Sequence, residues 1–385
     1  MSRRKRKAPR WLQQPLYLAI RSMLGAMMCG SLEANLRTAR GLGRSYAAFE
    51  KSRFARTMHA LGVAFPDMPQ DERHERTFQA YEHLFTLGVE MIYTPRLLTT
   101  DGWAEYVRVG ELAAAMDSLT NGRPCVLITG HCGNWELLGF TLALIGFPVH
   151  ALYRPLDLRP MDRWVRQTRE RRGLRLVDKF GAARSLPRLI DGGAHVGVIA
   201  DQNAGDRGMF VPFFNRLAST YKSIGLMALR FNAPIICGQA RRLVWERDAA
   251  HEGDDRHLER DASLGFGKWT GEPFRYRLDV LDVIHPADWA DQPDPLFYVT
   301  ARYRRALEGM VRRAPEQNLW LHRYWKSRPR HERLGRPFPS SLREKIRQLP
   351  WITDNDLARI EDWSARDARA LAAGVRHDAP EAAAV

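Results

Sequence analysis

Residues 126–136 read VLITGHCGNWE and carry the clearest signal of the fold class. The first four of them form a short apolar run, which predicts a buried strand. Two glycines then allow a sharp turn with close backbone approach, and Asn134 is a good N-cap for a helix over 136–144. The stretch therefore predicts a strand that carries His131 to its carboxyl end, where open α/β sheets bind their ligands.

The same alternation of apolar runs and helical stretches continues on the C-terminal side. We predict further strands over 149–153, 196–200 and 234–237, and helices over 161–172, 183–190 and 221–231. Strands that alternate with helices indicate an α/β sheet covered on both faces. A later strand over 274–283 is expected to pair with 241–247, and the polar, glycine-rich stretch 248–271 between them is expected to be a loop.

The two ends of the chain follow other patterns. Apolar residues recur at helical spacing over 33–122, which predicts helices there. Residues 353–356, TDND, are typical of a helix N-cap and predict a helix through about Ala372. We expect the last residues, 379–385, to be disordered.

Composition excludes several classes of protein. The 385 residues are 45% hydrophobic and 27% charged, which is normal for a globular protein and excludes wholesale disorder, a collagen-like chain and a polytopic membrane protein. The net charge of +15 favours an acidic partner, namely nucleic acid, an anionic membrane face or an acidic carrier protein. The four cysteines form no CxxC pair, which argues against a disulfide framework or a zinc ribbon and favours a reducing, cytoplasmic setting.

The N-terminus combines a basic head with an apolar segment. Six of the first ten residues are basic, and residues 11–32 carry one charge, Arg21. The segment is about long enough to span a bilayer, but a charge near its centre costs roughly 2.5–3.5 kcal/mol there. We therefore expect a helix that lies in or is tilted through the membrane interface, with the basic head on the cytoplasmic side. An ordinary buried helix is the alternative.

His131 and Glu136 are the candidate catalytic residues. Within one continuous helix, residues five apart could not meet. With His131 in the turn and Glu136 in the first turn of the helix, they can hydrogen-bond. A carboxylate on one imidazole nitrogen orients the ring and favours its protonated form, as in the base-and-orienter half of a catalytic triad. Cys132 is a poor nucleophile candidate because adjacent side chains rarely face each other, and a structural histidine is the alternative for His131.

Five blocks in order carry a resemblance to a known family. TGHCGNWELLG, residues 129–139, resembles the HX4(D/E) motif of the lipid A biosynthesis acyltransferases in its HX4E form. Four later stretches resemble further blocks of the same family: ALYRPLD (151–157), RQTRERRGLRLV (166–177), GVIADQNAGDRGMFVPFF (197–214) and NLWLHRYWKSRP (318–329). The phosphatidylinositol mannoside acyltransferases are related. Asn215, the polar insertion near 248–271 and the tail beyond about 340 depart from the family pattern.

The resemblance implies an α/β fold with an acyltransferase-type mixed sheet flanked by helices and an N-terminal membrane-associated helix. We expect a basic N-terminus with a membrane-interface or transmembrane helix over 1–45, an acyltransferase domain over 46–340, and a helical tail over 341–385. The implied activity moves a fatty acyl group from acyl carrier protein or acyl-CoA to a hydroxyl of a lipid A-like or other glycolipid or phospholipid. The implied location is the cytoplasmic face of the inner membrane, with no metal, no cofactor and no nucleic-acid partner.

The resemblance and the positions of the residues also nominate groups that bind substrate: Asn134, Arg154, Arg169, Asp201 and Gln202. Arg154 suits a phosphate or pantetheine contact. Asp201 ends a predicted strand and can face the same cleft, or it can form a structural salt bridge, for example to Arg154. Backbone N–H groups near 133–135, at a helix N-terminus, are candidate donors to the oxyanion.

Two alternatives remain open at this point. The acceptor can differ, which would make the chain a lysophospholipid acyltransferase or another lipid acyltransferase. The chain can instead be a non-catalytic, basic membrane-binding protein, although this leaves His131 and Glu136 without a purpose. A cluster in the predicted loop, from His251 to His257, contains metal-ligating residue types, but its spacing matches no standard ligand set.

Overall fold

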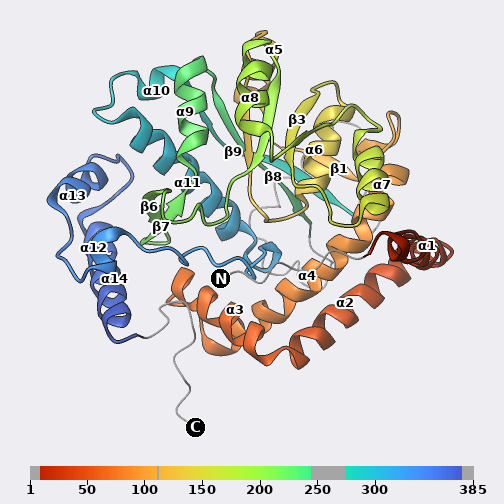
Figure 1. The fold of residues 1–385 in the computed structure, drawn as a ribbon, viewed down its shortest axis with the longest axis horizontal. Helices are drawn as coiled ribbons and strands as arrows, with labels where there is room; N and C mark the ends of the chain where they lie inside the picture. The colour runs from red at the N-terminus through yellow and green to blue at the C-terminus, as the bar shows by residue number, and fades with distance from the viewer. Residues whose placement is uncertain (1–8, 111, 244–273, 375–385) are drawn as a thin grey trace, which may run out of the picture.

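A seven-stranded mixed sheet forms the centre of the protein in a computed structural model that describes residues 9–110, 112–243 and 274–374 (Figure 1). Across the sheet, the strands follow the order β1 (Val107–Val109), β9 (Tyr276–Ile284), β8 (Ile235–Arg242), β2 (Val126–Thr129), β5 (His195–Ile199), β3 (Val149–Tyr153) and β4 (Arg175–Asp178). The five strands from β8 to β4 are mutually parallel, β9 is antiparallel to β8, and β1 is parallel to β9. The predicted mixed α/β sheet is therefore confirmed.

Helices cover both faces of this sheet, as predicted. Apolar residues of α5 (Ala113–Thr120) and α6 (Trp135–Leu144) form one cluster with Leu127 and Ile236 of the central strands. On the other face, α8 (Ala182–Asp191), α9 (Lys222–Phe231) and α11 (Pro295–Arg313) pack on Val126 and Ile128. All four residues of β2 are buried, because a strand between two helical layers has no solvent face.

Several strands differ from the sequence-based expectations. The runs 234–237 and 241–247 were predicted as two strands, but β8 is one continuous strand through Arg242 that pairs with β9 and has a register shift at Cys237/Gly238. We did not predict β4, an edge strand with two exposed residues and no long apolar run. The hairpin of β6 (Met209–Phe213) and β7 (Arg216–Thr220) was also missed, and its turn residues Phe214 and Asn215 both have a positive φ of 52°.

The first hundred residues are mainly helical, as predicted. They form α1 (Arg10–Met27), α2 (Leu32–Phe49), α3 (Lys51–Ala64) and α4 (Gln70–Leu97), followed by the short helix η1 (Trp103–Glu105). Strand β1 was not predicted, because the whole range 33–122 was expected to be helical. In Figure 1, α2, α3 and α4 lie together along one edge of the molecule, and α1 lies beside α7 (Arg159–Glu170). There the guanidinium of Arg21 lies 4.5 Å from the ring centroid of Trp164.

The membrane-span test gives a mixed result for this end of the chain. Among the described residues, no single helix has both the length and the apolar character to cross a membrane. The helix pair Trp11–Met27 and Leu32–Phe49 meets both criteria when taken together, but the two helices are bent by 120° at the break between them.

The C-terminal helices are tied to the hairpin by buried charges. They are α12 (Arg330–Arg333), α13 (Ser340–Arg347) and α14 (Asp354–Ala372), and the predicted N-cap of α14 is confirmed as a capping box at Thr353. Asp367 of α14 pairs with the buried Arg216 of β7 and, at 2.7 Å, with the buried Arg328. Breaking such a pair leaves an uncompensated buried charge, so this contact holds α14 in place.

Short elements complete the chain: α10 (Pro286–Ala290) and η5 (Pro315–Gln317). The predicted loop over 248–271, its cluster of metal-ligating residue types and the C-terminal stretch 379–385 lie outside the described residues.

Candidate active site

The turn after β2 places His131 at the carboxyl edge of the sheet, as predicted. Gly133 makes this turn possible, because its φ is +68° and a Cβ there would lie 2.1 Å from the carbonyl oxygen of Ala240. Asn134 caps α6, as predicted, by accepting a hydrogen bond from the N–H of Leu137 at 2.9 Å. Strand, turn and helix thus hold the imidazole in one place.

The partner of His131 is Asp201, and this corrects the expected pairing with Glu136. Nδ1 of His131 lies 2.8 Å from Oδ1 of Asp201. The carboxylate only accepts hydrogen bonds, so Nδ1 carries the proton, and in the neutral ring Nε2 is left with its lone pair. The contact forms because β2 and β5 are adjacent and parallel, with Thr129 paired to Ile199, so both chains leave the sheet at the same edge.

The surroundings of Asp201 keep it charged. The side chain is buried, and its main-chain oxygen accepts a hydrogen bond from Nη1 of the fully buried Arg304 at 2.6 Å. Burial would raise the pKa of the Asp201 carboxyl, but the hydrogen bond and charge of His131 outweigh it and keep this pKa below its ordinary value. The alternative of a salt bridge from Asp201 to Arg154 is not realised, and Arg154 is exposed on the loop after β3.

Glu136 lies in the first turn of α6, as predicted, but its partner is Arg169 of α7. Both side chains of this ion pair are mostly buried, at 18% and 19% exposed. The Arg169 guanidinium also lies 5.1 Å from the ring centroid of Tyr153, and its Nε is buried without a hydrogen-bond partner among the described residues. A buried donor left without a partner is a candidate contact for substrate.

His322, which the sequence reasoning did not select, lies against His131. The His322 and His131 rings are 4.5 Å apart in an edge-to-face arrangement, and Gln202 donates a hydrogen bond from its amide to Nε2 of His322 at 3.2 Å. Burial and the charge of His131 lower the pKa of His322 to about 4. Gln202 therefore contacts the neutral ring of His322, which packs against His131.

His322 lies in the last of the five blocks that resemble the family, and this block could have pointed to it. Backbone hydrogen bonds hold the segment against the turn that contains His131. The N–H of Leu319 donates to the carbonyl oxygen of His131 at 2.8 Å, and Cys132 forms an isolated bridge with Asn318. The two motifs, far apart in the sequence, thus form one site.

Several groups around the turn are engaged within the protein. Asn134 is fully buried and donates to Glu90 at 3.3 Å, and its expected contact with substrate stays a prediction. The expected oxyanion donors near 133–135 are mostly engaged, because the N–H groups of Gly133 and Asn134 donate to the carbonyls of residues 317 and 240. The N–H of Trp135 remains as a candidate. Cys132 is buried with a pKa raised well above its ordinary value by desolvation, which agrees with rejecting it as a nucleophile.

A buried polar network supports the turn from behind. Glu90 of α4 accepts hydrogen bonds from Arg242 of β8 at 2.6 Å and from Tyr276 of β9. Arg242 also donates to Nδ1 of His83, whose Nε2–H donates to the carbonyl oxygen of Gly133 at 3.2 Å. Burial lowers the pKa of His83 well below its ordinary value, and the charge of Arg242 adds to this. The network connects α4 and two strands to the residue that shapes the turn.

One set of side chains in the site has the composition of a metal site. The ligand atoms of His131, Asp201 and His322 lie within 4.8 Å of one another. Two imidazoles and a carboxylate can bind a divalent ion, but the direct hydrogen bond between His131 and Asp201 also satisfies both groups. The expectation that the site needs no metal stays a prediction.

The comparisons with known proteins agree with this geometry. The model of the bacterial lipid A biosynthesis acyltransferases matches residues 3–243, which include His131, Glu136, Arg169 and Asp201. The block with His322 lies beyond the matched residues, although it packs against the matched turn. No curated protein matches the sequence significantly. The chain belongs to the bacterial lipid A biosynthesis acyltransferase family, and it is an acyltransferase.

Proposed function

We propose that this protein transfers a fatty acyl group from an acyl thioester to a hydroxyl of a lipid A-like glycolipid, with His131 as the general base. The donor is acyl carrier protein or acyl-CoA, and a phospholipid is the alternative acceptor. The observation that carries the proposal is the hydrogen bond between Nδ1 of His131 and the buried, charged Asp201. This contact leaves Nε2 free to take a proton.

In the proposed first step, Nε2 of His131 removes the proton from the acceptor hydroxyl as its oxygen attacks the thioester carbonyl. A C–O bond forms, and the carbonyl oxygen becomes an oxyanion. The Asp201 carboxylate stabilises the imidazolium ion that results. The N–H of Trp135, at the N-terminus of α6, is the candidate donor to the oxyanion.

In the proposed second step, the tetrahedral intermediate collapses and the C–S bond breaks. The imidazolium of His131 returns its proton to the departing thiolate, so the products are an ester and a thiol. Arg169 is held in the site by Glu136 and offers its unpaired Nε–H to substrate. We therefore assign Glu136 as a positioning residue for Arg169.

The surface of α1 supports the proposed location at the cytoplasmic face of the inner membrane. Its exposed large apolar side chains are Trp11, Leu12, Leu16, Leu18 and Met23. Apolar side chains beside a basic head favour binding to an anionic bilayer surface. The arginine-rich α7, next to α1, offers a basic surface for an acidic carrier protein or for lipid headgroups.

The test is the lipid profile, by mass spectrometry, of a deletion strain complemented with wild type, His131→Ala or His74→Ala. His74 is an exposed histidine of α4 and provides the matched control. We expect one lipid to lose a fixed acyl mass in the deletion strain and to regain it with wild type and His74→Ala only. Full restoration by His131→Ala would contradict the assignment of the base.

The purified enzyme tests the donor and the metal. Transfer is measured with acyl carrier protein and with CoA as the acyl carrier, before and after treatment with EDTA. We expect activity to survive chelation, because the proposed steps use only side chains and backbone groups. Loss of activity on chelation, with recovery on adding a divalent ion, would assign the three ligand atoms near His131 to a metal instead.

A further inference from the structure

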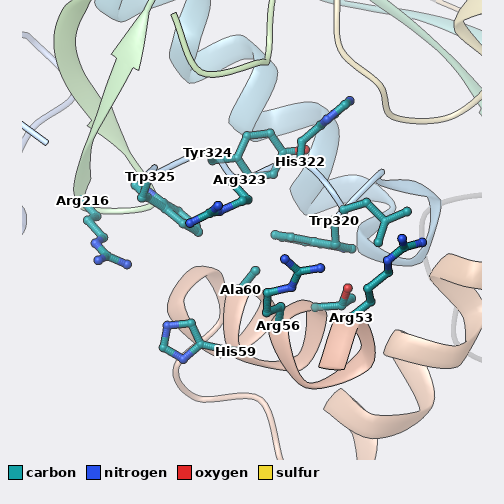
Figure 2. A pocket seen from close by; sticks show the side chains of 12 residues that line it. Arg53, Arg56, His59, Ala60, Arg216, Trp320, His322, Arg323, Tyr324 and Trp325 are labelled. Carbon is teal, nitrogen blue, oxygen red and sulfur yellow. The ribbon is translucent and has the colours of Figure 1, made fainter. Parts of the chain in front are cut away.

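A cavity outside the catalytic site lies between α3 and residues 320–325 (Figure 2). The cavity is partly open to solvent, and the empty space between its lining atoms and in the adjoining solvent is about 460 Å³. Trp320 and Trp325 contribute to its lining, and their indole N–H groups donate to backbone carbonyls elsewhere. Both tryptophans are 4% exposed, and the guanidinium of Arg216 lies 5.4 Å from the ring centroid of Trp325.

The charge of this cavity is one-sided. Its lining includes the arginines Arg53, Arg56, Arg216 and Arg323 and the histidines His59 and His322. Among the described residues that line it, none is an aspartate or a glutamate. Because an excess of positive charge attracts ions of the opposite sign, such a cavity favours an anionic occupant.

Not all of this charge is available to a ligand. Arg216 is neutralised by its buried pair with Asp367, and Arg53 lies 3.5 Å from Glu50 in a half-exposed pair of little strength. Arg56 has no carboxylate within ion-pair distance among the described residues, and Figure 2 shows it reaching from α3 toward Trp320. Arg56 is thus the centre of the uncompensated charge.

The cavity also adjoins the catalytic base. His322 lines it, but in Figure 2 the His322 side chain points away from α3. On that side, its ring packs 4.5 Å from the ring of His131. One short segment therefore separates the cavity from the reacting groups.

We propose that this cavity binds a phosphate group carried by the lipid headgroup of the acceptor, with Arg56 as its main contact and Arg323 beside it. A planar guanidinium matches the oxygens of a phosphate in a two-point contact, which an ammonium does not. A lipid source is favoured over free phosphate because the cavity lies near His131. A phosphate bound there would position the lipid that carries it next to the reacting groups, whereas free phosphate would position nothing. The lipid identity rests on the proposed function, but the binding of phosphate does not.

The experiment measures binding of monomeric dihexanoyl phosphatidic acid, dihexanoylglycerol and inorganic phosphate to the full-length protein by isothermal titration calorimetry. Dihexanoylglycerol has the same acyl chains without the phosphate. The variants are Arg56→Gln, Arg323→Gln and Arg56→Lys. The control is Arg230→Gln on α9, which removes an exposed arginine at the opposite side of the molecule from α3 (Figure 1).

We expect wild type and Arg230→Gln to bind the phosphatidic acid at least about tenfold more tightly than dihexanoylglycerol. Because a hydrogen bond to a charged group is lost, Arg56→Gln should weaken binding of the phosphatidic acid by about tenfold or more and leave dihexanoylglycerol unchanged. Arg323→Gln should weaken it less, and Arg56→Lys should fall between wild type and Arg56→Gln. Circular dichroism and the unfolding midpoint establish that each variant is folded.

Two outcomes would overturn the proposal. If folded Arg56→Gln binds phosphatidic acid as wild type does, the cavity is not the phosphate site. If inorganic phosphate binds as tightly as phosphatidic acid with the same dependence on Arg56, the lipid source is wrong. His131→Ala should bind phosphatidic acid as the wild type does. If the wild type binds phosphatidic acid but transfers no acyl group, the proposed function is rejected and the phosphate site is retained.

Discussion

The contact between His131 and Asp201 can be tested by Asp201→Asn, which removes the carboxylate charge and keeps its shape. The Asn side chain can still accept the hydrogen bond from Nδ1–H, so the ring can stay in place. The contact from Arg304 goes to the main-chain oxygen of Asp201 and does not depend on the substitution. The variant therefore isolates the effect of the charge on the imidazolium ion formed during the reaction.

The size of the effect follows from the geometry. A donor–acceptor distance of 2.8 Å puts the two charge centres about 4 Å apart, and this separation gives about 4 kcal/mol at an effective dielectric constant of 20. Each 1.36 kcal/mol is about tenfold in rate, so we expect kcat to fall about 10³-fold. The same substitution in the serine protease triad lowers kcat by about 10⁴. KM should change little, because the imidazolium forms only as the reaction proceeds.

The assay is the initial rate of acyl transfer from the preferred thioester to the acceptor lipid, with kcat and KM measured separately. Asp282→Asn is the matched control. Asp282 lies on β9 and pairs with Arg302 of α11, so this variant also removes a carboxylate charge from an ion pair. We expect Asp282→Asn to retain the wild-type kcat. A fall of less than tenfold in Asp201→Asn, in protein with an unchanged unfolding midpoint, would refute the assignment of Asp201 as the partner of the base.

Three further predictions concern stability, measured as the free energy of unfolding in denaturant. Gly133→Ala should prevent stable folding, because the new Cβ would overlap a carbonyl oxygen of β8. Its control is Gly122→Ala, whose Cβ would meet no atom within 4 Å; this variant should lose only the roughly 1–2 kcal/mol that a left-handed backbone conformation costs. Asp367→Ala should cost about 3–5 kcal/mol by leaving two buried guanidinium groups short of a partner, against less than about 0.5 kcal/mol for Asp362→Ala in an exposed pair on the same helix. Below pH 6.5 the unfolded chain protonates His83 but the folded chain does not, so stability falls as the pH falls, by up to about 1.4 kcal/mol per pH unit. His83→Gln should flatten this slope, and equal slopes in the two proteins would contradict the burial of a neutral histidine.

The local elements of the central sheet could be predicted because their signals lie within a few residues. The run 126–129 became β2, Asn134 became the N-cap of α6, and the capping pattern at Thr353 became the start of α14. Strand β4 carried a weaker signal, because an edge strand has an exposed face and lacks a long apolar run. Each of these outcomes depends on propensity, capping or periodicity, which neighbouring residues determine.

The family could be recognised from the sequence, and His131 was proposed from it as the base. The HX4E spacing and the blocks that follow it carried the resemblance, and the matched family model confirms it. His131 and Asp201 were both selected as site residues, but as separate groups with different partners. The choice of Glu136 as the orienter followed from its nearness in sequence, and this is where the reasoning was wrong.

Only the tertiary structure decided which side chains meet. Asp201 reaches His131 because β5 is the parallel neighbour of β2, and strand order is a property of the whole sheet. His322 reaches the same ring because the neighbouring Leu319 donates a backbone hydrogen bond to the carbonyl oxygen of His131. Glu136 pairs with Arg169 of α7, a contact that its position in the sequence did not indicate. Spacing along the chain determines local elements, whereas hydrogen bonds between distant residues depend on how those elements pack.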